Sequence, residues 1–132
     1  QVVLPLLETD IMDIIEAVWE EKLDTLDIKW SDKSCACVVM ASGGYPEKYE
    51  TGKVISGLDE NGQCEGAFVY HAGTKLEDGK FLTAGGRVLG ITAYGDTLKE
   101  ALDTAYKAVD TISFEKAHYR HDIGKKALSA LK

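Results

Sequence analysis

An apolar stretch bounded by glycines and followed at once by a capped amphipathic helix constrains the fold of this chain more than any other feature. It reads Gly85-Gly86-Arg87-Val88-Leu89-Gly90-Ile91-Thr92-Ala93-Tyr94-Gly95 and predicts a buried strand after a tight turn. Glu100 follows Thr97 by three residues, which is the spacing of a capping box, so we expect a helix to begin there. Apolar residues then recur every three or four positions as far as Ile112, which gives this helix one buried face.

Arg87 stands directly after the glycine pair, between flexible backbone and an otherwise rigid unit. A guanidinium is a planar fork of donors that suits phosphate or carboxylate, and glycine lets backbone N–H groups approach such a ligand closely. The sequence therefore predicts an anion-binding site made by Arg87 with the amides of Gly85 and Gly86. The alternative interpretation is a surface arginine that simply follows a hairpin turn.

Composition excludes several classes of function. The 132 residues, 45% hydrophobic and 28% charged, fit one ordinary globular domain. No apolar run reaches the roughly 18 residues of a membrane helix, so we expect no membrane partner. The net charge of -7, without a basic stripe, argues against nucleic acid. Cys35, Cys37 and Cys64 lack metal-ligand spacing, and we interpret them as small hydrophobic residues in a reducing compartment.

The remaining pattern predicts short strands and two further helices. A helix capped by Thr9 or Asp10 should run to about Glu21, and its apolar face could pack on a segment that precedes Gln1. Strands are expected over residues 26–30, 35–41, 54–58, 65–72, 74–77 and 80–83, and a last helix over residues 125–131. Together these elements predict an α+β fold, a small antiparallel or barrel-like sheet flanked by helices.

Two further groups invite a functional interpretation. The long loop over residues 42–53 contains Gly44 and Tyr45 and suits a ligand-facing surface, although the same residues are ordinary turn chemistry. His71, at a strand end, is either a proton-transfer group or a structural histidine. His118 and His121 lie in a segment that reads as extended, so we predict no metal site there. A phosphate-cradling P-loop is absent.

The order of several motifs closely resembles the C-terminal domain of phosphoribosylamine–glycine ligase, also called glycinamide ribonucleotide synthetase, of the ATP-grasp superfamily. The resemblance covers nearly the whole chain. Its motifs are Ala41-Ser42-Gly43-Gly44-Tyr45-Pro46, Tyr49, Gly52-Lys53, Ile55, Phe68, His71-Ala72-Gly73-Thr74, Thr83, Gly85-Gly86-Arg87-Val88-Leu89-Gly90, Gly95-Asp96-Thr97, Ala105-Tyr106, Ile112, Tyr119-Arg120 and Asp122-Ile123-Gly124.

This resemblance implies a function for the parent protein. Such a ligase uses ATP and Mg2+ to activate glycine as an acyl phosphate, which the amine of phosphoribosylamine attacks to give glycinamide ribonucleotide in cytoplasmic purine biosynthesis. Gln1 resembles the last residue of the family signature Arg-Phe-Gly-Asp-Pro-Glu-Thr-Gln. We therefore expect residues 1–24 to be a helical remnant of the ATP-grasp core and residues 25–132 to be the C-terminal ligase domain.

The substrates phosphoribosylamine and glycine, and the N-terminal and ATP-grasp domains of the parent chain, are the expected partners. The candidate substrate-binding residues are Arg87, Gly85, Gly86, Gly44, Tyr45 and His71. No catalytic residue is assigned, because acyl transfer through a phosphorylated substrate needs positioning more than a protein nucleophile. We expect the isolated chain to be inactive and to bind neither ATP nor magnesium. The alternatives are a free-standing small-molecule-binding module and a purely structural domain.

Overall fold

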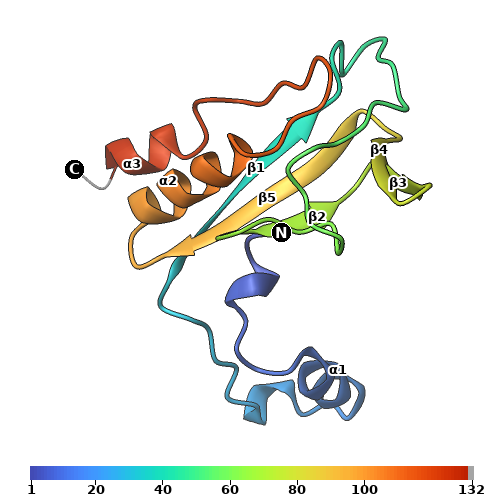
Figure 1. Cartoon of the computed structure of the whole chain (residues 1–132). Helices are drawn as coiled ribbons and strands as arrows, with labels where there is room; N and C mark the ends of the chain where they lie inside the picture. Colours follow the sequence, from blue (N-terminus) through green and yellow to red (C-terminus); the bar gives the residue numbers. More distant parts are fainter. Residues whose placement is uncertain (131–132) are drawn as a thin grey trace.

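A three-stranded antiparallel sheet with the order β1-β5-β2 forms the centre of the molecule (Figure 1). The structure is a computed structural model, and it describes residues 1–130. The strands of the central sheet are β1 (Ser34–Ala41), β2 (Phe68–His71) and β5 (Arg87–Gly95). A separate two-stranded hairpin is made by β3 (Thr74–Glu77) and β4 (Lys80–Thr83). The predicted α+β fold, with small antiparallel sheets flanked by helices, is confirmed, and the central sheet is open with β1 and β2 at its edges.

One helix covers a face of the central sheet, and a second, shorter helix lies beside the first (Figure 1). They are α2 (Leu98–Val109) and α3 (Lys125–Ala130). A third helix, α1 (Ile11–Trp19), lies apart from the sheet between two short 3-10 turns, η1 (Leu4–Leu6) and η2 (Leu23–Thr25). The part of the last predicted helix at residue 131 lies outside the described residues. No helix within residues 1–130 has both the length and the apolar character to cross a membrane.

The core forms where the inner face of the sheet meets α2. Residues Val38 and Met40 of β1 are paired with Ile91 and Leu89 of β5, and all four are at most 1% exposed. The small side chains of α2 allow this helix to approach the sheet closely, and they are Ala101, Ala105 and Ala108. This burial of apolar side chains is the main stabilising contribution to the fold and holds β5 rigidly in place.

The capping box predicted at the start of α2 is confirmed. The Thr97 side chain accepts a hydrogen bond from the Glu100 backbone N–H, and the Glu100 carboxylate accepts one from the Thr97 N–H. The helix ends at Val109 rather than at Ile112. The N–H of Ile112 donates to the carbonyl oxygen of Val109, an i to i−3 bond, so the last apolar position is buried by a turn instead of by the helix.

Two predicted strands are wrong. Residues 26–30 form no strand, and only Trp30 makes an isolated bridge, with Leu7. Residues 54–58 likewise make single bridges, from Val54 to Leu82 and from Ser56 to Ser113. Each segment forms bridges to neighbouring backbone at single residues only. A β-ladder needs several consecutive partners, so the alternating pattern does not produce a strand in either segment.

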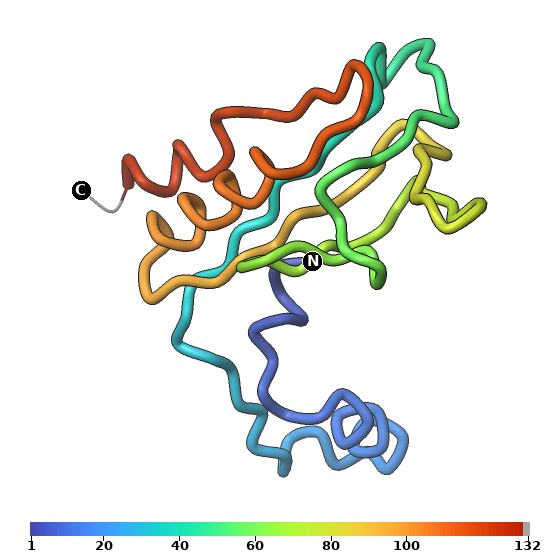
Figure 2. The backbone as a smooth tube through the Cα atoms, in the orientation of Figure 1, coloured from blue at the N-terminus to red at the C-terminus, as the bar shows by residue number. Residues whose placement is uncertain are grey.

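The first residues cross the outer face of the sheet, opposite α2, as the tube in Figure 2 shows. The Thr92 hydroxyl donates to the carbonyl oxygen of Gln1 at 3.2 Å, and the Tyr94 hydroxyl donates to that of Pro5 at 3.1 Å. A Cβ on Gly90 would lie 3.0 Å from the Gln1 side chain, so glycine permits this close approach. The start of the chain is thereby fixed to the sheet.

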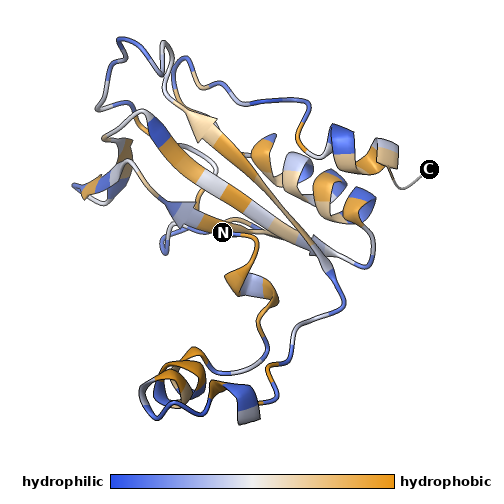
Figure 3. Ribbon diagram, turned by 180° about the vertical axis from the view of Figure 1, so that it is seen from behind, coloured by the Kyte–Doolittle hydropathy of each residue, from blue (hydrophilic) through white to orange (hydrophobic). Residues whose placement is uncertain are grey.

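Helix α1 exposes most of its apolar side chains. Ile15 is 53% exposed and Trp19 is 88% exposed, and no residue of the helix is buried. Figure 3 shows the apolar colouring of this helix away from the sheet. The Asp10 side chain caps it by accepting from the Met12 N–H, as the sequence predicts. The helix is well formed, and apart from the half-buried Ile14 and Ala17 its apolar side chains are exposed.

Candidate functional site

A surface hollow of about 750 Å³ opens where β5 begins, and we call it the Arg87 hollow. The turn made by Gly85 and Gly86, just before β5, lies against the loop that follows β1, and the two segments are joined by a hydrogen bond from the Ser42 N–H to the Gly86 carbonyl oxygen. Together they form one wall of the hollow. The lining residues come from four segments of the chain and are Gln1, Val39, Tyr45, Ala72, Gly73, Gly86, Arg87, Leu89 and Gly90.

Among residues 1–130, Arg87 is the only charged side chain in this lining, and no carboxylate of that part of the chain lines the hollow. Its guanidinium makes no ion pair and no hydrogen bond with any residue in the described part of the chain. Backbone N–H groups of Gly85 and Gly86 also donate to no residue within 1–130. An exposed guanidinium next to uncommitted amides, without a neighbouring carboxylate, is suited to an anion.

Two lysines, Lys53 and Lys116, differ from Arg87 because carboxylates already neutralise their charge. Lys53 contacts Glu50 at 3.0 Å and Glu115 at 2.9 Å. The hydrogen bond that Lys53 donates to Glu115, followed by the one that it donates to Glu50, raises the pKa of this lysine. Lys116 shares Glu50 at 3.7 Å. These lysines therefore attract a further anion less strongly than Arg87 does.

Tyr45 forms the wall of the hollow beside Gly86. A Cβ on Gly86 would lie 2.1 Å from Cδ2 of the Tyr45 ring, so the ring rests directly on the glycine backbone. The ring also meets Tyr49 edge to face, with centroids 6.0 Å apart. Gly86 is buried and Tyr45 half-buried, so the predicted loop residue and the predicted glycine lie together in one site.

A smaller apolar hollow of about 210 Å³ lies next to the first and shares Val39, Tyr45 and Arg87 with it. Its opposite side includes Arg120, the second of the two arginines in the sequence. Arg120 donates from Nε and Nη2 to the two carboxylate oxygens of Asp122, each at 2.8 Å. This pair lowers the pKa of Asp122 and satisfies Arg120, which leaves Arg87 as the available guanidinium.

The structure places the other predicted site residues differently. Gly85 adjoins the hollow in the same turn, and Gly44 has a φ of 95° in the left-handed region, where its role is to turn the backbone. His71 does not line the hollow. Its Nε2 donates to the carbonyl oxygen of Gly62 at 2.9 Å, and its Nδ1 accepts from the Thr74 hydroxyl at 2.8 Å. Both nitrogens are occupied, which suits a structural role; the assignment of substrate-binding residues stays a prediction.

Sequence reasoning missed six residues that line the Arg87 hollow, namely Gln1, Val39, Ala72, Gly73, Leu89 and Gly90. Gln1 arrives from the other end of the chain, and Val39 points outward from a strand that reads as wholly apolar. Ala72 and Gly73 follow β2, and a Cβ on Gly73 would lie 2.7 Å from the Gly85 Cα, so these two segments touch. The motif His71-Ala72-Gly73-Thr74 is the sequence signal from which Ala72 and Gly73 could have been predicted.

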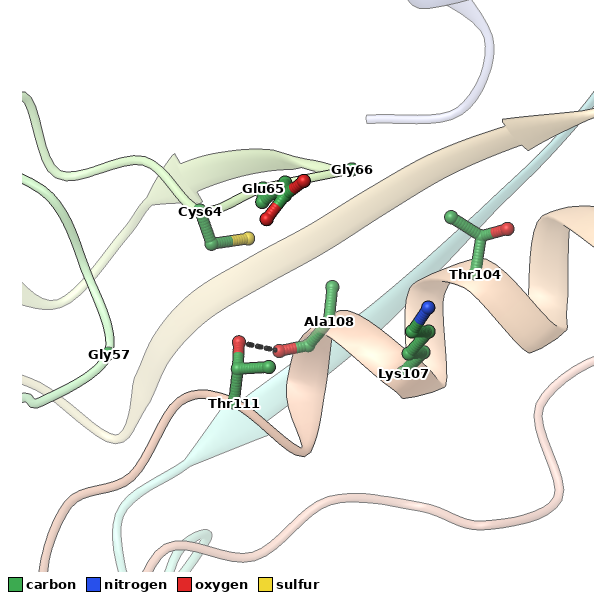
Figure 4. Close-up of a pocket in the computed structure, with 8 residues that line it drawn as sticks. All are labelled: Gly57, Cys64, Glu65, Gly66, Thr104, Lys107, Ala108 and Thr111. Atoms are coloured by element: carbon green, nitrogen blue, oxygen red, sulfur yellow. Dashed lines mark hydrogen bonds between the residues drawn. The ribbon is translucent and has the colours of Figure 1, made fainter.

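A third hollow, of about 470 Å³, lies between α2 and the loop over residues 57–66 (Figure 4). It contains one cation, Lys107, and one carboxylate, Glu65, so it has no preference of charge. Burial raises the pKa of the Cys64 thiol, which keeps this cysteine in its unreactive form. Within residues 1–130, no group of three or more His, Cys, Asp or Glu side chains is placed to hold a metal ion.

The fold is similar to part of a larger ligase. In the crystal structure of phosphoribosylamine–glycine ligase from Thermotoga maritima, the matching region covers 92% of this chain and 29% of that chain, with a TM-score of 0.70 and 31% identity. The chain belongs to the family described as phosphoribosylglycinamide synthetase, C domain, whose model matches residues 35–126. The family resemblance noted in the sequence is thereby confirmed.

Relatives with similar sequences bear the name of the same ligase or of a purine biosynthetic protein. Phosphoribosylamine–glycine ligase of Caldanaerobacter subterraneus subsp. tengcongensis is 53% identical over 123 residues, which are 93% of this chain and 29% of that protein. A bifunctional purine biosynthetic protein of Dictyostelium discoideum is 48% identical over 132 residues, which are 99% of this chain and 16% of that protein. The chain thus spans less than a third of these relatives. The predicted division after residue 24 stays a prediction.

Proposed function

We propose that this chain works as the C-terminal domain of a phosphoribosylamine–glycine ligase. The parent enzyme would join phosphoribosylamine to glycine with ATP, giving glycinamide ribonucleotide in de novo purine biosynthesis. Membership of the C-domain family supports this proposal, as do the names of the relatives. The family chemistry also implies a cytoplasmic location, which is part of the same proposal.

The observation that carries a substrate role for this domain is the uncommitted guanidinium of Arg87. Phosphoribosylamine carries a phosphate group that takes no part in bond making, and such a group is a natural handle for orienting the substrate. Arg87 would bind this phosphate, while Tyr45 and Gly86 would form the wall beside it. The domain would therefore contribute substrate binding and positioning.

Nucleotide and metal binding are proposed for the rest of the ligase. Within residues 1–130, no group of three or more His, Cys, Asp or Glu side chains is placed to hold a metal ion. ATP and Mg2+ would supply the activation of glycine from parts of the enzyme outside this chain. We expect the isolated chain to release no ADP above background when it is incubated with ATP, magnesium, glycine and phosphoribosylamine. Measurable release would refute that expectation.

The exposed face of α1 fits a role as a contact with the preceding part of the ligase. Most of its apolar side chains, including Ile15 and Trp19, are exposed. The family model begins only at residue 35, whereas the relatives also match the residues before it. Helix α1 would thus pack against the preceding domains of the parent chain, which are its proposed partners.

Steady-state kinetics of Arg87→Ala in the complete ligase tests the substrate role. The KM for phosphoribosylamine should rise about 10- to 100-fold, the size expected for losing hydrogen bonds to a charged group, with kcat little changed. The KM values for ATP and glycine should stay constant. Arg120→Ala is the matched control, because Asp122 already occupies that guanidinium. An unchanged KM for phosphoribosylamine in Arg87→Ala would rule out the anion site.

A further inference from the structure

Ser42 stands between the end of β1 and the turn that precedes Arg87, and all three of its polar groups make hydrogen bonds. Its backbone N–H donates to the carbonyl oxygen of Gly86 at 2.8 Å. Its hydroxyl donates to the carbonyl oxygen of Gly85, also at 2.8 Å. Its own carbonyl oxygen accepts from the Tyr45 N–H at 3.1 Å. At 3% exposure, Ser42 is one of the few buried polar residues of the chain.

These bonds restrict a segment whose own residues have wide conformational freedom. Two adjacent glycines lack the steric restriction of a Cβ, so each peptide between residues 85 and 87 has many accessible orientations. A single residue holds two consecutive carbonyl groups of this turn, one through its backbone and one through its side chain. The hydroxyl is the only side-chain group that performs this function, because the turn receives no other side-chain hydrogen bond within residues 1–130.

The consequence for the hollow follows from the planarity of the peptide bond. The carbonyl oxygen of Gly85 and the N–H of Gly86 belong to one trans peptide and point in opposite directions. When the Ser42 hydroxyl holds that oxygen, the Gly86 N–H is directed away from Ser42. Gly86 lines the Arg87 hollow, and its N–H donates to no described residue. The hydroxyl therefore sets the direction of an uncommitted donor beside Arg87.

We propose that Ser42 is a positioning residue for the anion site: by holding the Gly85 carbonyl, it presents the Gly86 N–H beside Arg87 as a second donor to a phosphate monoester. Ser42 also begins the turn that places the Tyr45 ring on Gly86, so it orients the wall of the hollow as well. This inference rests on the proposed function of Arg87. Ser42 itself would not contact the ligand.

The test uses the 132-residue chain with ribose 5-phosphate as the probe, followed by 1H–15N NMR at millimolar ligand. In the unsubstituted chain, the amide signals of Gly86 and Arg87 should shift on titration. Ser42→Ala should lower the affinity about fivefold, the size expected when one directed hydrogen bond is lost. The ligand-induced shift of the Gly86 amide should shrink more than that of Arg87. Ser42→Cys, nearly equal in volume and a weaker donor, should lower the affinity by a smaller factor.

Ser129→Ala is the matched control, because it removes a hydroxyl that donates to the carbonyl oxygen of Lys125 at 2.9 Å on an exposed helix far along the chain. Its affinity should equal that of the unsubstituted chain. If binding depends on Arg87 but is unchanged in both Ser42 variants, the positioning role of Ser42 is overturned while the anion site at Arg87 stands. No binding by the unsubstituted chain, or binding that Arg87→Ala leaves unchanged, would overturn the anion site itself. Should Ser42→Ala fail to fold, the Ser42→Cys titration decides.

Discussion

The contact between Gly86 and Tyr45 makes the site testable through stability. In Gly86→Ala the new methyl carbon would lie 2.1 Å from Cδ2, 2.6 Å from Cε2 and 3.1 Å from Cγ of the ring. Carbon atoms in contact are normally about 3.5–4.0 Å apart, so the whole ring has to move. Overpacking of this kind costs about 1–3 kcal/mol. We therefore expect Gly86→Ala to lower the free energy of unfolding by about 2 kcal/mol.

A double-mutant cycle isolates the cause. In a Tyr45→Ala background the obstruction is gone, and the φ of Gly86 lies outside the left-handed region. The same Gly86→Ala change should then be neutral or stabilise by about 0.4–1 kcal/mol through the unfolded chain. The assay is urea unfolding of the four proteins with equal m values. An equal cost of Gly86→Ala in both backgrounds would show that the ring does not rest on Gly86.

Two further predictions concern other parts of the chain. Arg120 lowers the pKa of Asp122 through its hydrogen bonds, so the unfolded chain binds this proton more readily than the folded one. At neutral pH the unsubstituted chain should be more stable to unfolding than Asp122→Asn. This difference in stability should fade as the pH falls through the lowered pKa of Asp122 in the folded state, and it should weaken in high salt because the ion pair is exposed. It is measured by urea unfolding across a pH series, and an advantage that grows in acid would contradict the assignment. Trp19→Ser should leave the isolated chain unchanged because Trp19 is 88% exposed, but it should destabilise the complete ligase by about 2 kcal/mol or more if α1 is buried there. Equal thermal shifts in both proteins would exclude that contact.

Prediction from sequence succeeded where the determining interactions are local. Thr97 and Glu100 are three residues apart, and their reciprocal hydrogen bonds form whenever that helix begins. The Asp78-Gly79 turn of the β3–β4 hairpin behaves in the same way, since both residues take the positive φ that such a turn needs. The strands over residues 35–41 and 87–95 were also predictable, because their apolar runs demand burial on a sheet.

Prediction failed where distant segments decide the outcome. Residues 26–30 have a strand-like alternation, yet their only β-bridge joins Trp30 to Leu7, and the carbonyl oxygen of Lys29 accepts from the N–H groups of Glu8 and Thr9 without forming a ladder. The ring of His71 packs on Phe81 and its Nε2 hydrogen-bonds to Gly62, a placement that the sequence did not state, while its role in substrate binding stays a prediction. Nothing in the spacing of the residues distinguishes these cases, because a single sequence does not state which segments become neighbours.

The sequence by itself determined the glycine turn, the buried strand that follows it, the capped helix and the presence of one arginine beside flexible backbone. Each depends on the steric and hydrogen-bonding properties of residues a few positions apart. Only the tertiary structure decided that Arg87 makes no ion pair with any residue from 1 to 130, that Tyr45 lies on Gly86 and that Ser42 holds the turn. Those contacts join residues more than 40 positions apart, and they exist because burial of β1 and β5 against α2 brings the ends of the two strands together.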